Sequence, residues 1–493
     1  SYTDGARTVT TTSDLSSFND PNPIKTQTIY DGLGRKTENR EYEGGSNYIV
    51  SQIQYDALGR AFKKSNPFRP WQGESAVWTT TAFDAIGRVI SVTNPDGAVV
   101  STSYSGNSTT ITDQAGKARK SVADALDRAT SVYEDPNGLN YQTSYGYDGL
   151  DNLTTVTQGV QTRSFVYDSL KRLTSATSPE SGTTSYQYDA NGNMTLKTDA
   201  RGVSSTYVYD ALNRNTSIDY SDATPDVFKQ YDLAVKGVGR LNQTWQSGTK
   251  TSATYIDSYD ACGRPVIMRQ RYETSGVWSA SYQTTRTYNQ AGGVTTQTYP
   301  SGHTVTYNYD AAGRASGFTG TLGDGTNRNY ATNLTYSSFG EISREDFGTT
   351  TPLYHKSFYN IRGQLFDTRL SSVNDLWDWN RGRLILYYSS NHIWGQSGTD
   401  NNGNVRFAET WIPPENATLD QSDTLIEDAY SYDSLNRLSS VQEQQMSVAG
   451  GWGNWQQQFR QQYTYDRYGN RDIRFEQSEW IPDDAERHRQ RAV

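Results

Sequence analysis

Apolar, aromatic and polar residues follow one six-residue pattern along most of the chain. Tyr comes first and Asp second, the fourth position is mostly apolar, the fifth is Gly, Asn or Asp, and the sixth is usually Arg. Good copies begin at Tyr30, Tyr55, Phe83, Tyr147, Tyr167, Tyr188, Tyr209, Tyr259, Tyr309, Tyr432 and Tyr465. Degenerate copies begin at Ala123, Tyr288, Tyr336 and Tyr359. Self-similarity of this kind indicates a tandem repeat.

The spacing of the copies predicts the secondary structure of each repeat. Tyr147, Tyr167, Tyr188 and Tyr209 are 20, 21 and 21 residues apart. A second turn signal, residues 198–202, falls halfway between two copies, so turns recur about every ten residues and leave room for strands of about six or seven residues. Each repeat is therefore predicted to be two antiparallel strands and two turns.

The hexamer has the chemistry of a hairpin turn. Asp is favoured at the first position of a type I turn, and the fifth position of the hexamer needs the left-handed conformation that Gly, Asn and Asp tolerate best. Among the good copies only Lys171 departs from this rule. The predicted structural turn residues are Tyr30, Asp31, Gly34, Arg35, Tyr55, Asp56, Gly59, Arg60, Tyr188, Asp189, Gly192, Tyr209, Asp210, Asn213, Arg214, Tyr309, Asp310, Gly313, Arg314, Tyr432, Asp433, Asn436 and Arg437.

The remaining positions of the hexamer suggest packing roles. We expect the apolar fourth residue to fold back over a Tyr, and each Tyr to stack on its equivalents in neighbouring repeats. The closing Arg could hydrogen-bond the preceding carboxylate or lie across an aromatic ring. Cys262 occupies the fourth position of its copy, so it is expected to be a small buried apolar residue that reacts slowly with thiol reagents.

Composition supports sheet and excludes several classes of protein. The 493 residues carry 36 Tyr and 11 Trp but a net charge of only -9, and the repeat order argues against disorder. The negative net charge argues against binding of nucleic acid. No apolar stretch is long enough for a membrane span. A single Cys cannot form an intramolecular disulfide.

Some repeats are longer or less regular than the others. Trp-bearing hairpin tips are predicted at residues 274–278, 76–78 and 453–455. The expected organisation is a lead-in at 1–23, a continuous repeat array at 24–475 with an irregular Trp-rich part at about 366–430, and a tail at 476–493. We expect this tail to lead to a segment outside the chain, so that the chain is a fragment of a larger protein.

No residue pattern indicates a catalytic, cofactor or metal site. His303, His355, His392 and His488 lack metal-ligand spacing and are expected to be ordinary strand or surface residues. Residues 395–398 lack the spacing of a nucleophile elbow, and residues 400–404 lack the acidic ligands of a calcium loop, so both are expected to be turns. The abundant Asp residues are demanded by the hexamer and carry little catalytic weight.

Tyr-Asp-x-x-Gly-Arg at a period near 21 resembles the YD repeat of the RHS family, which includes bacterial Rhs polymorphic toxins, the C components of insecticidal toxin complexes and the teneurins. The resemblance covers about residues 24–475 and implies a spiral β-sheet coiled into a hollow shell, which in bacterial members holds a toxic C-terminal polypeptide. Those members release the toxin by autoproteolysis at paired Asp-Pro-x-Gly motifs. This chain has one such motif, residues 135–138, without a partner, and we expect it to be a turn.

The sequence therefore predicts an all-β, non-enzymatic shell of stacked hairpins that encapsulates or presents another polypeptide, such as a toxin. The alternative is an extracellular binding or adhesion module that contacts carbohydrate or a partner cell through its aromatic hairpins. No cofactor and no nucleic-acid partner are expected. The resemblance implies a bacterial protein, secreted or at the cell surface.

Overall fold

The computed structural model is built almost entirely of β-strands. It describes residues 2–5, 7–16, 20–248, 252–321, 325–348, 350–415, 417, 424–447, 455–474 and 479–480. Within these ranges the strands are accompanied by one short 3-10 helix, η1 (Pro70–Gln72). The predicted all-β class is confirmed. None of the helical structure in these ranges is long and apolar enough to cross a membrane.

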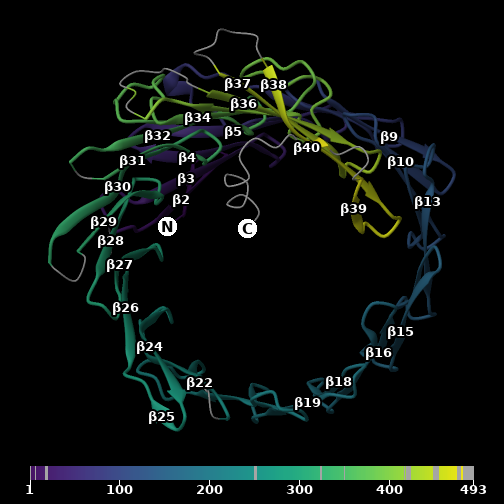
Figure 1. Cartoon of the computed structure of the whole chain (residues 1–493), viewed down its shortest axis with the longest axis vertical. Coiled ribbons are helices and arrows are strands. Elements are labelled where there is room, and N and C mark those ends of the chain that lie inside the picture. Colours follow the sequence, from purple (N-terminus) through teal and green to yellow (C-terminus); the bar gives the residue numbers. More distant parts are fainter. Residues whose placement is uncertain are drawn as a thin grey trace.

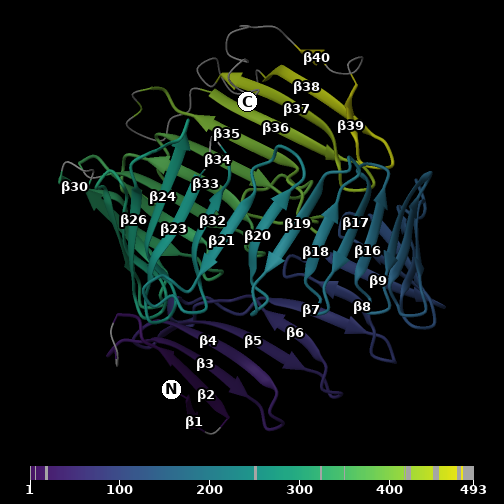
Figure 2. The ribbon, with the colours of Figure 1, turned by 90° about the horizontal axis from the view of Figure 1, so that it is seen from below.

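The strands form one long antiparallel strip. Each strand pairs with the strand that follows it in the chain, apart from two hairpin extensions at β25 and β39. Seen end-on, the strip curls into a ring with an open centre (Figure 1). Seen from the side, it rises as it curls, so that its last part lies above its first part (Figure 2).

We divide the strip into three parts. The lower winding, purple and blue in Figure 2, contains β1–β14. Its strands are β1 (Tyr2–Gly5), β2 (Thr8–Ser13), β3 (Ile24–Tyr30), β4 (Lys36–Gly44), β5 (Asn47–Tyr55), β6 (Ala61–Ser65), β7 (Trp78–Phe83), β8 (Val89–Thr93), β9 (Val99–Ser105), β10 (Ser108–Thr112), β11 (Ala118–Ala123), β12 (Ala129–Glu134), β13 (Tyr141–Tyr147) and β14 (Leu153–Gln158).

The connecting arc contains β15–β25 and runs through teal in Figure 1. Its strands are β15 (Gln161–Tyr167), β16 (Leu173–Ser178), β17 (Gly182–Tyr188), β18 (Met194–Thr198), β19 (Ser204–Tyr209), β20 (Asn215–Tyr220), β21 (Val227–Tyr231), β22 (Leu241–Gln246), β23 (Ser252–Tyr259), β24 (Pro265–Thr274) and β25 (Val277–Trp278). Strand lengths of five to seven residues from β15 to β22 match the regular turn spacing of the sequence.

The upper winding, green to yellow, contains β26–β40. Its strands are β26 (Tyr282–Tyr288), β27 (Val294–Thr298), β28 (Thr304–Tyr309), β29 (Ala315–Thr321), β30 (Asn327–Tyr336), β31 (Ile342–Phe347), β32 (Leu353–Tyr359), β33 (Leu365–Ser371), β34 (Gly382–Tyr387), β35 (Phe407–Ile412), β36 (Thr424–Tyr432), β37 (Leu438–Ser447), β38 (Trp455–Tyr465), β39 (Arg471–Ile473) and β40 (Glu479–Trp480).

Most of the wall is a single layer with solvent on both faces. In β17 exposed residues alternate strictly with half-buried ones, as expected where successive side chains point to opposite faces of a sheet. The chain exposes 27815 Å² of surface, about 1.5 times the roughly 18,000 Å² expected of a compact protein of its size. The wall therefore has little interior for apolar side chains to fill.

Buried residues concentrate in the irregular Trp-rich part of the upper winding. Asp367 is fully buried and accepts hydrogen bonds from Arg369 (2.7 Å) and Arg383 (2.6 Å). The indole of Trp394 donates a further bond to Asp367 (2.9 Å). Burial alone would raise the pKa of Asp367, but the bonds and charges of the two arginines outweigh it and hold that pKa below its usual value. The region predicted as irregular thus contains a buried, fully paired charge network.

Candidate functional site: the hexamer turn and the seam between windings

Each hexamer folds as a type I turn followed by a left-handed residue. In the first copy Gly34 N donates to Asp31 O (3.1 Å) and Asp31 N donates to Arg35 O (2.9 Å). Leu33 N and Arg35 N both donate to Asp31 Oδ1 at 2.9 Å, and Arg35 Nε donates to Asp31 Oδ2 (2.8 Å). The strand register shifts at Tyr30, which is the bulge that accompanies this three-residue connection.

The same geometry recurs in the other copies. Asp56 binds Arg60, Asp210 binds Arg214, Asp310 binds Arg314 and Asp433 binds Arg437 through the side-chain Nε at 2.7 to 2.9 Å. Asp189 holds Asn193 in the same way (2.9 Å). The fifth residue is left-handed throughout, with positive φ at Gly34, Gly59, Gly192, Asn213, Gly313 and Asn436.

Lys171 is the one fifth-position residue of the good copies that is not Gly, Asn or Asp, yet it adopts the same left-handed conformation. Its φ is 62°, and its backbone N donates to Asp168 O (3.0 Å) as in the other turns. The hexamer therefore imposes the left-handed conformation even on a Lys, at the steric cost that a Cβ brings.

The hexamer Tyr and Arg form a ladder between consecutive repeats. Tyr55 donates its hydroxyl hydrogen to Lys36 O (2.8 Å), and Arg35 lies over the Tyr55 ring at 4.4 Å. The expectation that Tyr rings stack on one another is replaced by this arrangement wherever the preceding hexamer supplies an Arg over the ring. Equivalent Arg–ring pairs include Arg60–Phe83, Arg172–Tyr188, Arg214–Tyr231, Arg314–Tyr336 and Arg437–Tyr465. The hydroxyls of Tyr188, Tyr209, Tyr309 and Tyr432 donate to Leu173, Met194, Val294 and Val405 carbonyls.

The fourth residue of the hexamer points away from the sheet, contrary to the sequence expectation. Leu33, Leu58 and Leu212 are 78%, 74% and 70% exposed. The third residue of a type I turn lies beyond the strand ends, so its side chain has no neighbouring ring to cover. Cys262, in the same position, is exposed rather than buried.

The exposure of Cys262 reverses the expected labelling. We expect a thiol reagent to modify the native protein at nearly the rate of the urea-unfolded protein, because the turn leaves the sulfur open to solvent. The measurement is the ratio of the two rates at one pH. A native rate lower by about tenfold or more would contradict this orientation of the fourth residue.

The hexamer carboxylates make the fold sensitive to acid. Hydrogen bonds from backbone N–H groups and Arg side chains lower the pKa of Asp31, Asp56 and Asp210. A lowered folded-state pKa contributes stability above the unfolded value of about 3.9, which is lost as the pH falls through the folded value. We therefore expect the urea midpoint to be constant from about pH 7 to 5 and to fall steeply below about pH 4. Asp56→Asn should weaken this dependence; an unchanged profile would show that the turn does not stabilise the ionised form.

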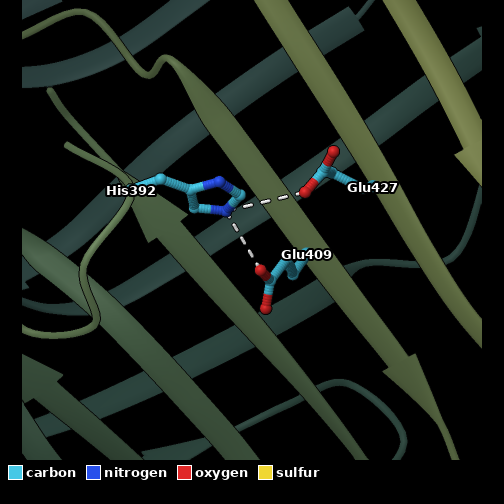
Figure 3. A group of neighbouring side chains, drawn as sticks. All are labelled: His392, Glu409 and Glu427. Carbon is cyan, nitrogen blue, oxygen red and sulfur yellow. Dashed lines mark hydrogen bonds and ion pairs between the residues drawn. The ribbon is translucent and has the colours of Figure 1, made fainter. Parts of the chain in front are cut away.

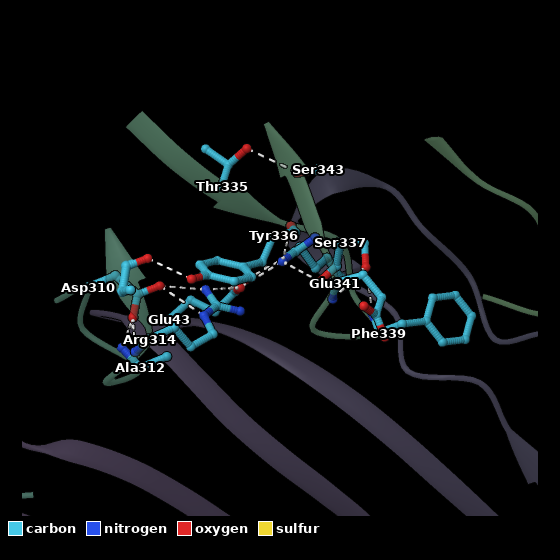
Figure 4. Close-up of polar contacts among 12 residues, drawn as sticks. Glu43, Asp310, Ala312, Arg314, Thr335, Tyr336, Ser337, Phe339, Glu341 and Ser343 are labelled. Carbon is cyan, nitrogen blue, oxygen red and sulfur yellow. Dashed lines mark hydrogen bonds and ion pairs between the residues drawn. The ribbon is translucent and has the colours of Figure 1, made fainter. Parts of the chain in front are cut away.

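The upper winding rests on the lower winding along a seam. Two kinds of turn meet there: hexamer turns of the upper winding and the connecting turns at the opposite strand ends of the lower winding. The best-defined contact joins Glu43 to Arg69 and Arg314; Figure 4 shows Glu43 beside Arg314. Arg69 donates two bonds to Glu43 (2.6 and 2.7 Å) and one each to Tyr336 O (2.9 Å) and Ser337 O (3.2 Å).

Arg314 adds a bond to Glu43 (2.9 Å) while keeping its own Asp310 (2.7 Å). The side chains of Glu43 and Arg69 are only 10% and 8% exposed. Burial opposes ionisation of Glu43, but the bonds and charges of the two arginines hold its pKa below the usual value. The seam thus includes a buried, fully paired ionic contact.

Further contacts extend the seam around the ring. They join residues 266 to 325 positions apart, which is the length of chain in one winding. They are Asn66 to Ile361 O, Asp96 to Arg362, Asp113 to Asn402 and Asn436, and Gln142 O to Arg467. Each links a connecting turn, or the strand start after it, to a hexamer turn or the adjacent 388–406 loop. Arg314 and Asn436 therefore act both within their own turns and between windings.

One of the three predicted Trp-bearing hairpin tips is present in the described residues. Residues 274–278 form the predicted hairpin tip, with Ser275 and Gly276 left-handed. Trp78 instead opens β7 and is not at a tip; the tip of that connection carries η1. Trp455 pairs with Met446, and the predicted tip at 453–454 lies outside the described residues, as do His488 and the tail beyond Trp480.

The predicted simple turns are present. In the Asp135 motif Gly138 N donates to Asp135 O (3.0 Å), and Leu139 N donates to Asp135 Oδ2 (2.9 Å). In residues 400–404 Asn401 N donates to Gly398 O (3.1 Å), and the buried Asn401 side chain binds Gln364 (2.7 Å). Both segments fold as turns, and their side chains are engaged with the protein itself.

One group of side chains was missed by sequence reasoning. His392, Glu409 and Glu427 lie together, with their ligand atoms all within 4.8 Å of one another. They are separated by 17 and 18 positions in the chain, and only the pairing of β35 with β36 brings the two carboxylates together. His303 and His355 lie elsewhere, against Tyr330 (2.9 Å) and Glu345 (2.9 Å).

Comparison with known proteins supports the fold. The RHS repeat family matches residues 167–203. Among curated protein sequences none matches the chain. The crystal structures of TcdB2-TccC3-Cdc42 and of TcdB2-TccC3 share the fold, each with a TM-score of 0.76 and 18% identity over 94% and 96% of this chain. The Photorhabdus luminescens Tc holotoxin pore matches with a TM-score of 0.75 and 18% identity over 96% of the chain.

This chain spans only 26% to 27% of the length of those structures. The match therefore concerns the fold of one part of them. The repeat recognised in the sequence is confirmed: residues 167–203 carry an RHS repeat, and the chain has the shell fold of the corresponding part of the TcdB2-TccC3 chains.

Proposed function

We propose that the chain is a non-enzymatic wall of an RHS-type shell that encapsulates or presents another polypeptide, such as a toxin. The observation that carries the proposal is the single-layered strip, which encircles an open centre and closes on itself along the seam (Figure 1). A single-layered wall with solvent on both faces is suited to enclosing another molecule. Residues 24–475 form the repeat array of the wall in this proposal, and β1 and β2 of the lead-in extend the same strip.

The edges of the strip support a polypeptide partner. Where a hexamer turn rests on the seam, its fourth residue is partly covered, as Leu435 is. Along the free edge of the lower winding Leu33, Leu58 and Ile86 are 78%, 74% and 76% exposed. Such a row of exposed apolar residues favours a further winding of similar repeats below it. The structural relatives are named as complexes of two components, and a secreted bacterial toxin complex is the setting that we propose.

Access of a large probe to an attached polypeptide tests enclosure. A short epitope placed after Val493 should bind its antibody slowly in the native protein and rapidly after unfolding. The same epitope placed before Ser1 is the matched control and should bind rapidly in both states, because the first described strand, β1, lies at the lower rim (Figure 2). Equal, fast binding at both ends of the native chain would overturn enclosure.

The alternative, a binding or adhesion module, is favoured by one surface feature. The β24–β25 hairpin exposes Tyr272, Val277 and Trp278, and Tyr282 lies 6.1 Å from the Tyr272 ring. Exposed aromatic faces of this kind can stack on sugar rings. Quenching of Trp fluorescence by an oligosaccharide, lost in Trp278→Ala, would support this function over enclosure.

A further inference from the structure

His392, Glu409 and Glu427 converge from three separate segments (Figure 3). His392 lies in the 388–406 loop between β34 and β35, while Glu409 and Glu427 are directly paired across β35 and β36. His392 Nε2 is 3.1 Å from Glu409 Oε1 and 3.6 Å from Glu427 Oε2. The Glu409 and Glu427 side chains are only 13% and 12% exposed.

Two largely buried carboxylates directly opposite each other on neighbouring strands repel one another. His392 can hydrogen-bond Glu409, but the 3.6 Å separation from Glu427 is too long for a second bond. Arg383 is near enough for its charge to act on Tyr387, which adjoins the cluster. Its guanidinium group is ion-paired with Asp367 (2.6 Å). A bound cation would offset the repulsion between the two carboxylates.

Two of the three separations between the ligand atoms can be compared with a coordination polyhedron, and the third is below 4.8 Å. Zinc bonds of about 2.0–2.1 Å in a tetrahedron place neighbouring ligand atoms about 3.3–3.4 Å apart. The observed 3.1 and 3.6 Å separations lie on either side of that value. One imidazole and two carboxylates are also a donor set that suits divalent first-row metals.

Each of the three ligands is held in place by different neighbouring side chains. Trp411 Nε1 donates to the second oxygen of Glu409 (3.1 Å), and Gln444 Nε2 donates to the second oxygen of Glu427 (2.6 Å). The His392 ring is stacked on Phe407 at 4.4 Å and meets the Tyr387 ring edge-on at 4.3 Å. Outer partners that fix one oxygen and leave the other directed inward are typical of metal sites.

We propose that His392, Glu409 and Glu427 bind one divalent transition-metal ion, with solvent as a further ligand on the side where His392 is 33% exposed. The ion would clamp the 388–406 loop to the wall. The same loop supplies Asn402, whose side chain binds Asp113 of the lower winding (3.1 Å). Metal binding would therefore also steady one contact of the seam.

Cobalt provides the direct test, because four- or five-coordinate Co²⁺ absorbs visible light far more strongly than the hydrated ion. The chelator-treated chain should bind one Co²⁺ with such a spectrum, and one Zn²⁺ should displace it. His392→Asn removes the imidazole, and Asn tolerates the left-handed φ of 48° at this position. It should lower the affinity for Zn²⁺ by about 100-fold or more, and Glu427→Gln should lower it by about tenfold or more.

His355→Gln is the matched control, since His355 contacts one carboxylate, Glu345, and lies outside the cluster. It should bind metal as the unchanged chain does. Circular dichroism and protease resistance in the absence of metal establish that each variant is folded. Binding that persists in folded His392→Asn, or a chain that shows only the spectrum of hydrated cobalt, would overturn the proposal.

Discussion

Arg69→Met is expected to open the seam while leaving the connecting arc folded. The side chain is buried and holds Glu43 together with two carbonyls of the upper winding. Removing one partner of a buried ion pair typically costs about 3–5 kcal/mol, and we expect the lower end, about 3 kcal/mol, because Arg314 still reaches Glu43. Denaturant unfolding and limited proteolysis measure the effect, and cleavage should appear first near residues 336–337.

Two variants separate the seam from a general loss of an arginine. Arg35→Met makes the same change in a hexamer at the free edge, where the side chain is 30% exposed, and should cost no more than about 1 kcal/mol. Glu43→Gln combined with Arg69→Met should be less harmful than Arg69→Met alone, because no buried charge is left without its main partner. Equal effects of Arg69→Met and Arg35→Met would show that the windings do not depend on this contact.

Replacing the fifth hexamer residue by Val should lower the free energy of unfolding more than replacing it by Asn. The size of the effect should differ between the connecting arc and the seam. Gly192 in the arc has φ 88° and open space around a Cβ. Gly192→Val should cost about 1–2 kcal/mol for the left-handed backbone, whereas Gly192→Asn should be nearly neutral because Asn213 occupies that position in the next copy. In a repeat array the damage should be local, so a protease site should open near residue 192.

Gly313 should tolerate Asn less well than Gly192 does, because the lower winding lies against it. A Cβ there would lie 2.5 Å from Ile24 Cδ1 of the lower winding. Gly313→Asn should therefore destabilise the protein more than Gly192→Asn, and Ile24→Ala in the same chain should recover part of the loss. If Val and Asn are tolerated equally at Gly192, the position is not left-handed in solution and the turn assignment fails.

The sequence determined the repeat unit because the forces that form it are local. The Asp carboxylate, the left-handed residue and the Arg of one hexamer lie within six positions, so their hydrogen bonds follow from spacing alone. The all-β class, the hairpin repeat and the RHS resemblance were accordingly predicted. Even at this level the side-chain directions were not: Leu33 and Cys262 are exposed, and Tyr55 lies under Arg35 rather than against another Tyr.

Only the tertiary structure decided which copies do more than turn the chain. Arg35 and Arg314 occupy the same hexamer position, yet only Arg314 reaches Glu43, because the twist and curvature of many strands bring residues about 270 positions apart to the seam. The same holds for His392, Glu409 and Glu427, which meet through the register of β35 on β36 and the path of the preceding loop. The curvature of the strip is the sum of small rotations between neighbouring strands, and no single repeat encodes that sum. The local pattern therefore specified each hairpin, and long-range geometry specified which hairpins meet at the seam.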